Sequence, residues 1–132
     1  GMPLVYSGDE YGLNHSLKFF EKDSIPKTKG KQWNWRAKLG KLKNENSALN
    51  GGKKASKYTR ISTSNDAKIL AFERSNDKSK VIYFANLTNA SQLATAKIEG
   101  NYVNYMTDEK ITFAKDQKID LKPLQYYILI NE

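Results

Sequence analysis

The chain has 132 residues, a formal net charge of +8 and no cysteine. Hydrophobic residues make up 39% of it and aromatic residues 11%, which is enough for one compact core and argues against a wholly disordered chain. The lack of cysteine excludes disulfides, thiolate metal sites and thiol catalysis, and no apolar run reaches the roughly 18 residues of a membrane span.

The chain opens with a short apolar run at residues 2–7, Met-Pro-Leu-Val-Tyr-Ser. The run does not alternate with polar residues, which is typical of a strand buried on both faces, as in a parallel sheet. Gly8 ends the predicted strand, and residues 13–32 form a long predicted loop around one aromatic pair, Phe19 and Phe20. Loops of this length are usually functional or disordered.

A helix is predicted next, over about residues 33–46. Trp35, Leu39 and Leu42 are spaced four and three residues apart, so they share one helical face that we expect to be buried. Two glycines then stop the helix, and residues 51–57 have the composition of a flexible linker. One strand and one helix cannot build a core of their own, so this first part of the chain forms an incomplete unit.

The remainder of the chain has the pattern of an all-β domain. Short runs rich in β-branched and aromatic residues alternate with turn sequences every 8–12 residues or so, which predicts a mainly antiparallel β-sandwich of Greek-key type. The predicted domain organisation is therefore 1–50, a linker at 51–57, and a sandwich at 58–132. Its eight strands are expected at residues 58–63, 68–75, 79–87, 92–98, 101–106, 110–113, 117–121 and 125–131.

Residues 1–12, Gly-Met-Pro-Leu-Val-Tyr-Ser-Gly-Asp-Glu-Tyr-Gly, resemble the last barrel strand of the α-amylase family of glycoside hydrolases. Members of that family typically have Gly-x-Pro-Leu-Ile-Tyr-x-Gly-Gln-Glu there. Residues 17–23 and 42–49 also look like the family, and residues 69–74 resemble the opening of its C-terminal β-domain. The resemblance continues to residues 126–130 and so covers nearly the whole chain.

The resemblance implies the tail of a larger enzyme that hydrolyses α-glucan such as starch. The tail would hold the last strand and helix of a TIM-like barrel, followed by a sandwich that stabilises the barrel. The family's catalytic carboxylates lie on earlier barrel strands, so no catalytic residue is expected here. Because TIM-barrel active sites lie at the C-terminal ends of the strands, Tyr6, Asp9 and Glu10 are expected beside the substrate in the full enzyme.

Two features limit the chemistry of these acids. Asp9 stands where the family typically has Gln. Adjacent residues on an extended chain point to opposite sides, so Asp9 and Glu10 are poorly placed as the two carboxyl groups of a glycosidase.

Other residues with chemical potential fit a structural role better. His15, the only histidine, has no partner pattern for catalysis and is expected to be a solvated loop residue. No metal-binding or phosphate-binding motif occurs, so neither a metal nor a cofactor is predicted. Tyrosines of the β-region are expected mostly to fill half-buried strand faces, although a carbohydrate platform stays open for them: Tyr58, Tyr83, Tyr102, Tyr105, Tyr126 and Tyr127.

Two alternative functions remain open at this point, a stand-alone carbohydrate-binding module and a nucleic-acid-binding protein. Residues 18–60 carry thirteen Lys and Arg against three Asp and Glu, but these lysines are scattered and no fold signature accompanies them, so nucleic acid is not the expected partner. The expected partners are a polysaccharide or oligosaccharide and the rest of a barrel, and no membrane.

Exposed apolar residues in the first 50 positions would form an interface. We therefore expect that segment to dock on the sandwich or on a second copy of the chain, as a homodimer. The first residues lack the pattern of a signal peptide, and a periplasmic, an extracellular and a cytoplasmic location all stay open.

Overall fold

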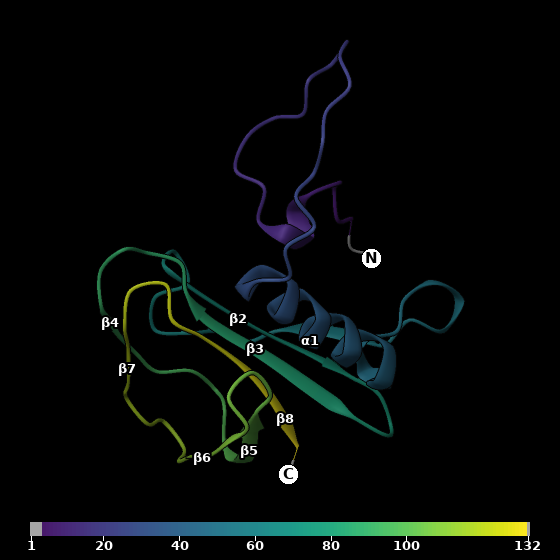
Figure 1. The fold of residues 1–132 in the computed structure, drawn as a ribbon. Helices are drawn as coiled ribbons and strands as arrows, with labels where there is room; N and C mark the ends of the chain where they lie inside the picture. The colour runs from purple at the N-terminus through teal and green to yellow at the C-terminus, as the bar shows by residue number, and fades with distance from the viewer. Residues whose placement is uncertain (1–3, 132) are drawn as a thin grey trace. The chain divides into compact units, whose positions relative to one another are not determined.

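The computed structural model describes residues 4–131, and the chain divides into two compact units, Gly1–Glu45 and Asn46–Glu132. The domain limits expected from the sequence, 1–50 and 58–132 with a linker between them, stay a prediction. Figure 1 shows the helix and the strands of the described part. The helical elements are η1 (Asp9–Tyr11), α1 (Lys31–Glu45), η2 (Ser47–Leu49) and η3 (Gly52–Lys54), and the strands are β1 (Lys57–Arg60), β2 (Ile69–Ser75), β3 (Lys80–Asn86), β4 (Gln92–Ala94), β5 (Gly100–Asn104), β6 (Glu109–Phe113), β7 (Ile119–Leu121) and β8 (Tyr126–Asn131).

The strand predicted at residues 2–7 is not formed by its described part, residues 4–7; residues 2 and 3 lie outside the described residues. Leu4 is 89% exposed and Tyr6 64%. A strand needs a neighbour for its backbone N–H and C=O groups, and no strand within residues 4–131 pairs with this segment. Residues 4–7 therefore have no strand partner in the described chain.

A tight turn follows, in which Gly8 has a role that another residue would not fill. Its φ is +97°, and a Cβ added there would lie 2.7 Å from Cδ2 of Leu13. The Gly8 carbonyl accepts hydrogen bonds from the N–H groups of Tyr11 and Leu13, both at 3.0 Å. Only glycine has both the left-handed freedom and the small volume that this turn requires.

Helix α1 agrees with the predicted helix to within two residues at its start. The expected buried face is wrong in part: Leu42 is buried, but Leu39 is half-buried and Trp35 is 39% exposed. The aromatic packing uses Trp33 instead, whose ring stacks on Tyr11 with centroids 5.3 Å apart. Spacing alone identified the face but did not show that Trp33, on another side of the helix, stacks on Tyr11.

The second unit has the predicted antiparallel architecture. Its larger sheet has the strand order β1-β2-β3-β8-β5-β6, and the smaller sheet pairs β4 with β7. Every pairing is antiparallel. The order places the last strand beside β3 and β5, far from its sequence neighbours, so the unit is a β-sandwich closed by its C-terminal strand. The fold class expected from the sequence is confirmed.

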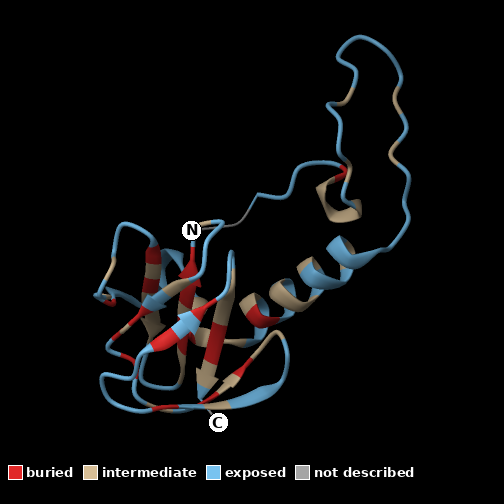
Figure 2. Ribbon diagram, turned by 90° about the vertical axis from the view of Figure 1, so that its left-hand side faces the viewer, coloured by how far each residue is buried: buried red, intermediate tan, exposed pale blue. Residues whose placement is uncertain are grey.

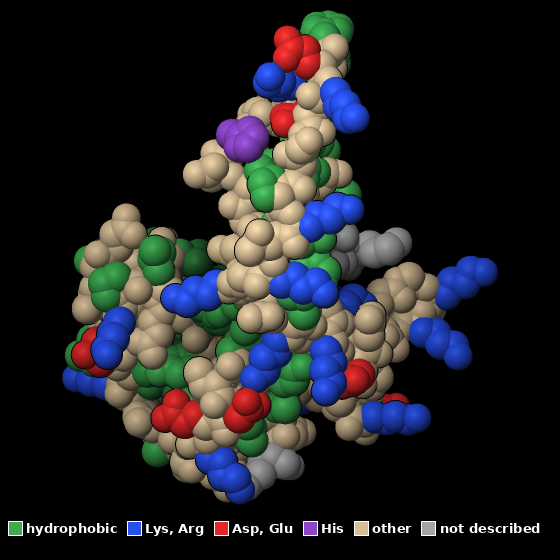
Figure 3. All heavy atoms as spheres, viewed as in Figure 1, with side chains coloured by type: hydrophobic (Ala, Val, Ile, Leu, Met, Phe, Trp, Pro, Cys, Tyr) green, Lys and Arg blue, Asp and Glu red, His purple; other side chains and the backbone are tan. Residues whose placement is uncertain are grey.

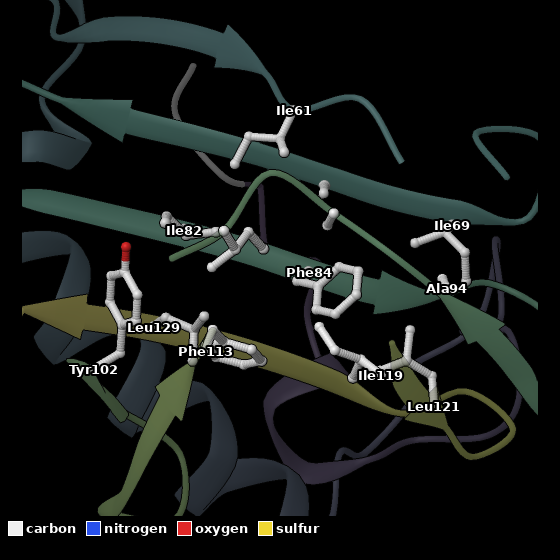
Figure 4. Packing of buried hydrophobic residues seen from close by; sticks show 13 residues of the cluster. Ile61, Ile69, Ile82, Phe84, Ala94, Tyr102, Phe113, Ile119, Leu121 and Leu129 are labelled. Atoms are coloured by element: carbon white, nitrogen blue, oxygen red, sulfur yellow. The ribbon is translucent and has the colours of Figure 1, made fainter. Parts of the chain in front are cut away.

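The hydrophobic core fills the space between the two sheets, as Figure 4 shows. It consists of inward-facing residues of strands β2 to β8 together with Ile61, Ala96 and Ile98 from the connections. Phe84, Leu121 and Leu129 are fully buried. Buried residues therefore concentrate on the strands, whereas residues 13–30 are largely exposed (Figure 2). The cluster comprises Ile61, Ile69, Ala71, Ile82, Phe84, Ala94, Ala96, Ile98, Tyr102, Phe113, Ile119, Leu121 and Leu129.

Two of the predicted core tyrosines belong to this packing. Tyr102 is buried and donates its hydroxyl to the carbonyl of Glu99 at 3.0 Å. Tyr127 packs on the cluster, with its ring 6.2 Å from both Phe84 and Phe113. Their hydroxyl groups find polar partners while the rings stay in apolar surroundings, which is the usual arrangement of a buried tyrosine.

Candidate functional site

The three residues singled out from the sequence lie in the turn that follows residues 4–7. The Asp9 carboxylate accepts a hydrogen bond from the Tyr6 N–H at 3.2 Å, and the Glu10 carboxylate accepts one from the Gly8 N–H at 3.0 Å. Both acids therefore hold the backbone of their own turn. This local role is a structural one, and no pattern in the sequence predicts it.

Arg36 of α1 connects the turn to the helix. Its Nε donates to the Asp9 carbonyl at 3.2 Å, and its Nη2 lies 3.9 Å from the Asp9 carboxylate. One arginine thus contacts both the backbone and the side chain of Asp9. Sequence spacing could not reveal this pair, because the two residues are 27 positions apart.

A pocket of about 660 Å³ opens beside the turn. Of the three candidates, the structure brings Tyr6 and Asp9 to its wall, while Glu10 is not among the lining residues. His15 also lines it, so the loop histidine is exposed, as expected, and in addition faces the pocket. Figure 3 shows the histidine (purple) at the surface. The complete lining is Tyr6, Ser7, Asp9, Leu13, Asn14, His15, Ser16 and Leu17.

The long loop after the pocket carries its aromatic pair fully exposed. Phe19 and Phe20 are 89% and 93% exposed and contact each other edge to face, with centroids 4.8 Å apart. The Asp23 carboxylate accepts hydrogen bonds from the N–H groups of Lys18 and Ser24, and these bonds, the one from Lys18 foremost, lower the Asp23 pKa below its usual value. The end of this loop is therefore held by backbone N–H groups that donate to the Asp23 carboxylate. Burial of the two phenylalanine rings does not contribute, because both are exposed.

An apolar groove of about 470 Å³ runs along α1. Val5, Trp35 and Leu39 provide its hydrophobic wall, and Arg36 and Lys43 lie at its polar margin. Exposed apolar surface of this kind is typical of an interface.

The second unit carries a row of rings across four neighbouring strands. Tyr58, Phe72, Tyr83 and Tyr126 succeed one another at centroid distances of 5.4, 5.4 and 6.3 Å. Successive rings are inclined by 34°, 32° and 24°, so they do not form one flat platform. Burial of the Tyr83 side chain raises its pKa, and the neighbouring Tyr126 adds a smaller effect in the same direction. The row is a half-buried strand face, of which only Tyr58 is exposed.

Charge and metal chemistry add no second site. Lys and Arg side chains are spread over the face seen in Figure 3 and do not gather into one patch. Within residues 4–131 there is no group of three or more His, Asp or Glu side chains placed to hold a metal ion. The same part of the chain has no helix that is long and apolar enough to cross a membrane.

Comparisons with known proteins give matches among solved structures alone: no family model matches the sequence, and no curated protein does. The noncanonic maltogenic α-amylase AmyB from Thermotoga neapolitana superposes with a TM-score of 0.80 at 17% identity, over 99% of this chain and 33% of AmyB. AmyP in complex with maltotriose gives 0.62 at 16% identity, over 82% of this chain and 22% of AmyP. AmyP in complex with maltose superposes with a TM-score of 0.61 at 15% identity, over 81% of this chain and 23% of AmyP.

The chain thus has the fold of a part of an α-amylase. The resemblance to the α-amylase family seen in the sequence is confirmed at the level of the fold. The chain spans about a third of AmyB and less than a quarter of AmyP.

Proposed function

We propose that the chain is the C-terminal part of a longer α-amylase-like glycosidase that hydrolyses α-glucan, such as starch or maltooligosaccharides. The observation that carries the proposal is the match to AmyB, which includes the first unit as well as the sandwich and yet leaves two thirds of AmyB unmatched. The residues that look like a last barrel strand and its helix are then part of a barrel supplied by the rest of the protein.

In this proposal the 132 residues have no catalytic carboxylate of their own. Retaining glycosidases need two carboxyl groups about 5–5.5 Å apart, one as nucleophile and one as acid and base. Asp9 and Glu10, the adjacent acids of the turn, each accept a backbone hydrogen bond there, which favours a structural role. The catalytic pair belongs to the preceding part of the longer protein, and the sandwich stabilises the barrel.

The apolar groove on α1 supports an interface with that preceding part. Val5 is 48% exposed, Trp35 is 39% exposed and Leu39 is half-buried, and all three line one groove. Contact with the remaining barrel would remove this surface from water. In the isolated chain a second copy would take its place, which gives the homodimer expected from the sequence.

No observation favours the two alternatives. A stand-alone carbohydrate-binding module needs a flat exposed row of aromatic rings, whereas the row on the sandwich is inclined and mostly half-buried. A nucleic-acid-binding surface needs a concentrated basic patch, whereas the basic side chains on the face drawn in Figure 3 are dispersed.

The test compares two polypeptides on soluble starch. The 132-residue chain alone is expected to release no reducing sugar, whereas the longer polypeptide, obtained by extending the reading frame upstream, is expected to release maltooligosaccharides. Sugar released by the short chain would contradict the inert role. A longer polypeptide without a barrel or without activity on α-glucan would contradict the glycosidase assignment.

A further inference from the structure

The connection between α1 and β1 contains an asparagine followed by a glycine, Asn50 and Gly51. Asn50 is the only asparagine of the sequence that precedes a glycine. Both residues are exposed, and a Cβ added at Gly51 would meet no atom within 4 Å. The peptide that joins them is therefore open to water and has no side chain on its C-terminal side to shield it.

This pair has the groups for a reaction within the chain. The deprotonated backbone nitrogen of Gly51 attacks Cγ of the Asn50 side chain, so that a new C–N bond forms. The bond from Cγ to the side-chain nitrogen breaks, and ammonia leaves with a proton from water. Water then opens the cyclic imide at one of its two carbonyls, which gives aspartate or isoaspartate. Within residues 4–131 the Gly51 N–H donates to no acceptor, so no hydrogen bond opposes its ionisation.

The fold holds this peptide away from the reactive geometry. The ψ angle of Asn50 is 142°, which is extended backbone, and closure of the nearly planar imide requires the Gly51 nitrogen to rotate toward Cβ of Asn50. The Asn50 carbonyl belongs to the same peptide and rotates with it. This carbonyl accepts hydrogen bonds from Nη2 of Arg74 at 2.7 Å and from the Ser56 N–H at 3.1 Å. Both bonds must break before the reacting atoms are aligned.

We propose that Asn50 is a site of spontaneous deamidation and that the hydrogen bond from Arg74 sets its rate. A bond from a charged donor is the stronger of the two restraints, and Arg74 is anchored in strand β2. The isoaspartate product lengthens the main chain by one atom. It does so inside a loop that the Ser56 hydroxyl closes on the Ser47 carbonyl at 2.8 Å. Deamidation therefore changes the covalent path of the connection between α1 and β1.

Peptide mapping by mass spectrometry tests the site after incubation of the 132-residue chain in mildly alkaline buffer. Aspartate and isoaspartate are expected at position 50, together with a more acidic species on cation-exchange chromatography. Asn89 is an internal control, because it is exposed as well but precedes an alanine, whose methyl group obstructs ring closure. Equal modification of Asn89 and Asn50 would overturn the assignment of the site.

Gly51→Ala is the matched control variant for the chemistry. The φ angle of Gly51 is −122°, which any residue adopts, and the added Cβ meets no atom within 4 Å, so the fold should not change. The methyl group hinders the attacking nitrogen, and deamidation at Asn50 is expected to slow about tenfold or more. An unchanged rate in this variant would contradict attack by the Gly51 nitrogen.

Arg74→Met tests the restraint, because it keeps an apolar stem and removes the charged donor. Deamidation at Asn50 is expected to be about three- to tenfold faster, since one hydrogen bond fewer has to break. Arg74→Lys, which keeps a charge and a donor, should recover part of the protection. An unchanged rate in Arg74→Met would refute the role of Arg74.

A measurement on the unmutated chain removes the dependence on variants. In urea neither hydrogen bond to the Asn50 carbonyl exists, so the unfolded chain is expected to deamidate faster than the folded chain. Equal rates in the two states would show that the fold does not restrain this peptide, and would refute control of the rate by Arg74.

Discussion

Asn86 shows how one buried polar side chain can hold a corner of the sandwich. Its Nδ2 group donates to the carbonyls of Ala90 and Lys122 at 2.7 and 2.9 Å, and its Oδ1 accepts from the N–H and the hydroxyl of Thr88. The residue is 1% exposed. The sequence Asn86-Leu87-Thr88 matches a glycosylation acceptor, but in the fold this amide is fully engaged with its neighbours.

Asn86→Asp is therefore expected to destabilise the chain strongly. The substitution places a second carboxylate oxygen against two carbonyl groups and removes both donated bonds, which costs about 3 kcal/mol for a buried group. Thermal denaturation should show Tm lowered by more than about 10 °C. Asn89→Asp, at an exposed position of the same turn, is the control. Equal Tm values for the two variants would mean that the Asn86 network does not contribute to stability.

Leu124 is a strained residue that the sequence does not reveal. Its φ is +55°, and it is 60% exposed in the turn that the Gln125 N–H closes on the Lys122 carbonyl at 3.1 Å. A left-handed conformation costs a residue with a Cβ roughly 1–2 kcal/mol, while little burial is lost if the side chain is removed.

Leu124→Gly is expected to raise the free energy of unfolding by about 0.5–1 kcal/mol, after the larger entropy of glycine in the unfolded chain is subtracted. Urea denaturation provides the measurement. Leu87→Gly is matched in residue type and exposure but lacks a positive φ, and it should lower stability. A decrease for both variants would refute the strain at position 124.

At the scale of elements, the connection between β1 and β2 is organised by a carboxylate. Asp66 Oδ1 accepts hydrogen bonds from the hydroxyl and the N–H of Thr63, both at 2.8 Å, and Arg60 lies 3.5 Å away. The bond from the Thr63 hydroxyl, followed by the one from its N–H, lowers the Asp66 pKa from its usual 3.8. A carboxyl with a lowered pKa stabilises the fold above its unfolded-state pKa.

This contribution should be lost as the pH falls below 3.8 and through the lowered pKa of the folded state. Asp66→Asn is expected to remove the loss of stability that protonation of Asp66 causes at acidic pH. The dependence of stability on pH near neutrality should stay unchanged. The measurement is the urea concentration at the midpoint of unfolding, determined at a series of pH values from neutral to acidic. Asp77→Asn, at an exposed position in the turn between β2 and β3, serves as control. An unchanged acid limb in the Asp66 variant would contradict the assignment.

The elements were predictable wherever local pattern determines them. Predicted and observed strands agree to within a few residues, because alternation and turn residues directly determine sheet faces and ends. The strand predicted at 92–98 ends early, at Ala94, because the Ile98 N–H turns back to the Ala96 carbonyl at 2.8 Å. Residues 4–7 could not be predicted in this way, because a strand depends on partners as well as on its own residues.

The candidate site was predictable only in part, for a related reason. The resemblance to a barrel strand led to Tyr6, Asp9 and Glu10, but it could not assign their bonds. The backbone N–H groups that donate to the Asp9 and Glu10 carboxylates, and the contact of Arg36 with Asp9, depend on the folded path of the chain. His15 belongs to no motif, so only the folded structure reveals that it lines the same pocket as Tyr6 and Asp9.

At the scale of the whole molecule, the two units differ in their means of stability. Every residue of the hydrophobic cluster lies between Ile61 and Leu129, so the sandwich contains a complete core. The described part of the first unit contributes one buried hydrophobic residue, Leu42. Burial of apolar surface is the main driving force of folding, so the sandwich should fold alone and the first unit should not.

Two fragments test this difference. Residues 46–132 are expected to unfold cooperatively on heating and to keep the dispersed NMR spectrum of the strands in the full chain. Residues 1–45 are expected to have little helix by circular dichroism, because an isolated helix of 15 residues is marginal in water. Phe84→Ala, which removes a fully buried ring at the centre of the core, should cost the sandwich fragment about 3–5 kcal/mol. A sandwich fragment without a cooperative transition would show that its core is not self-sufficient.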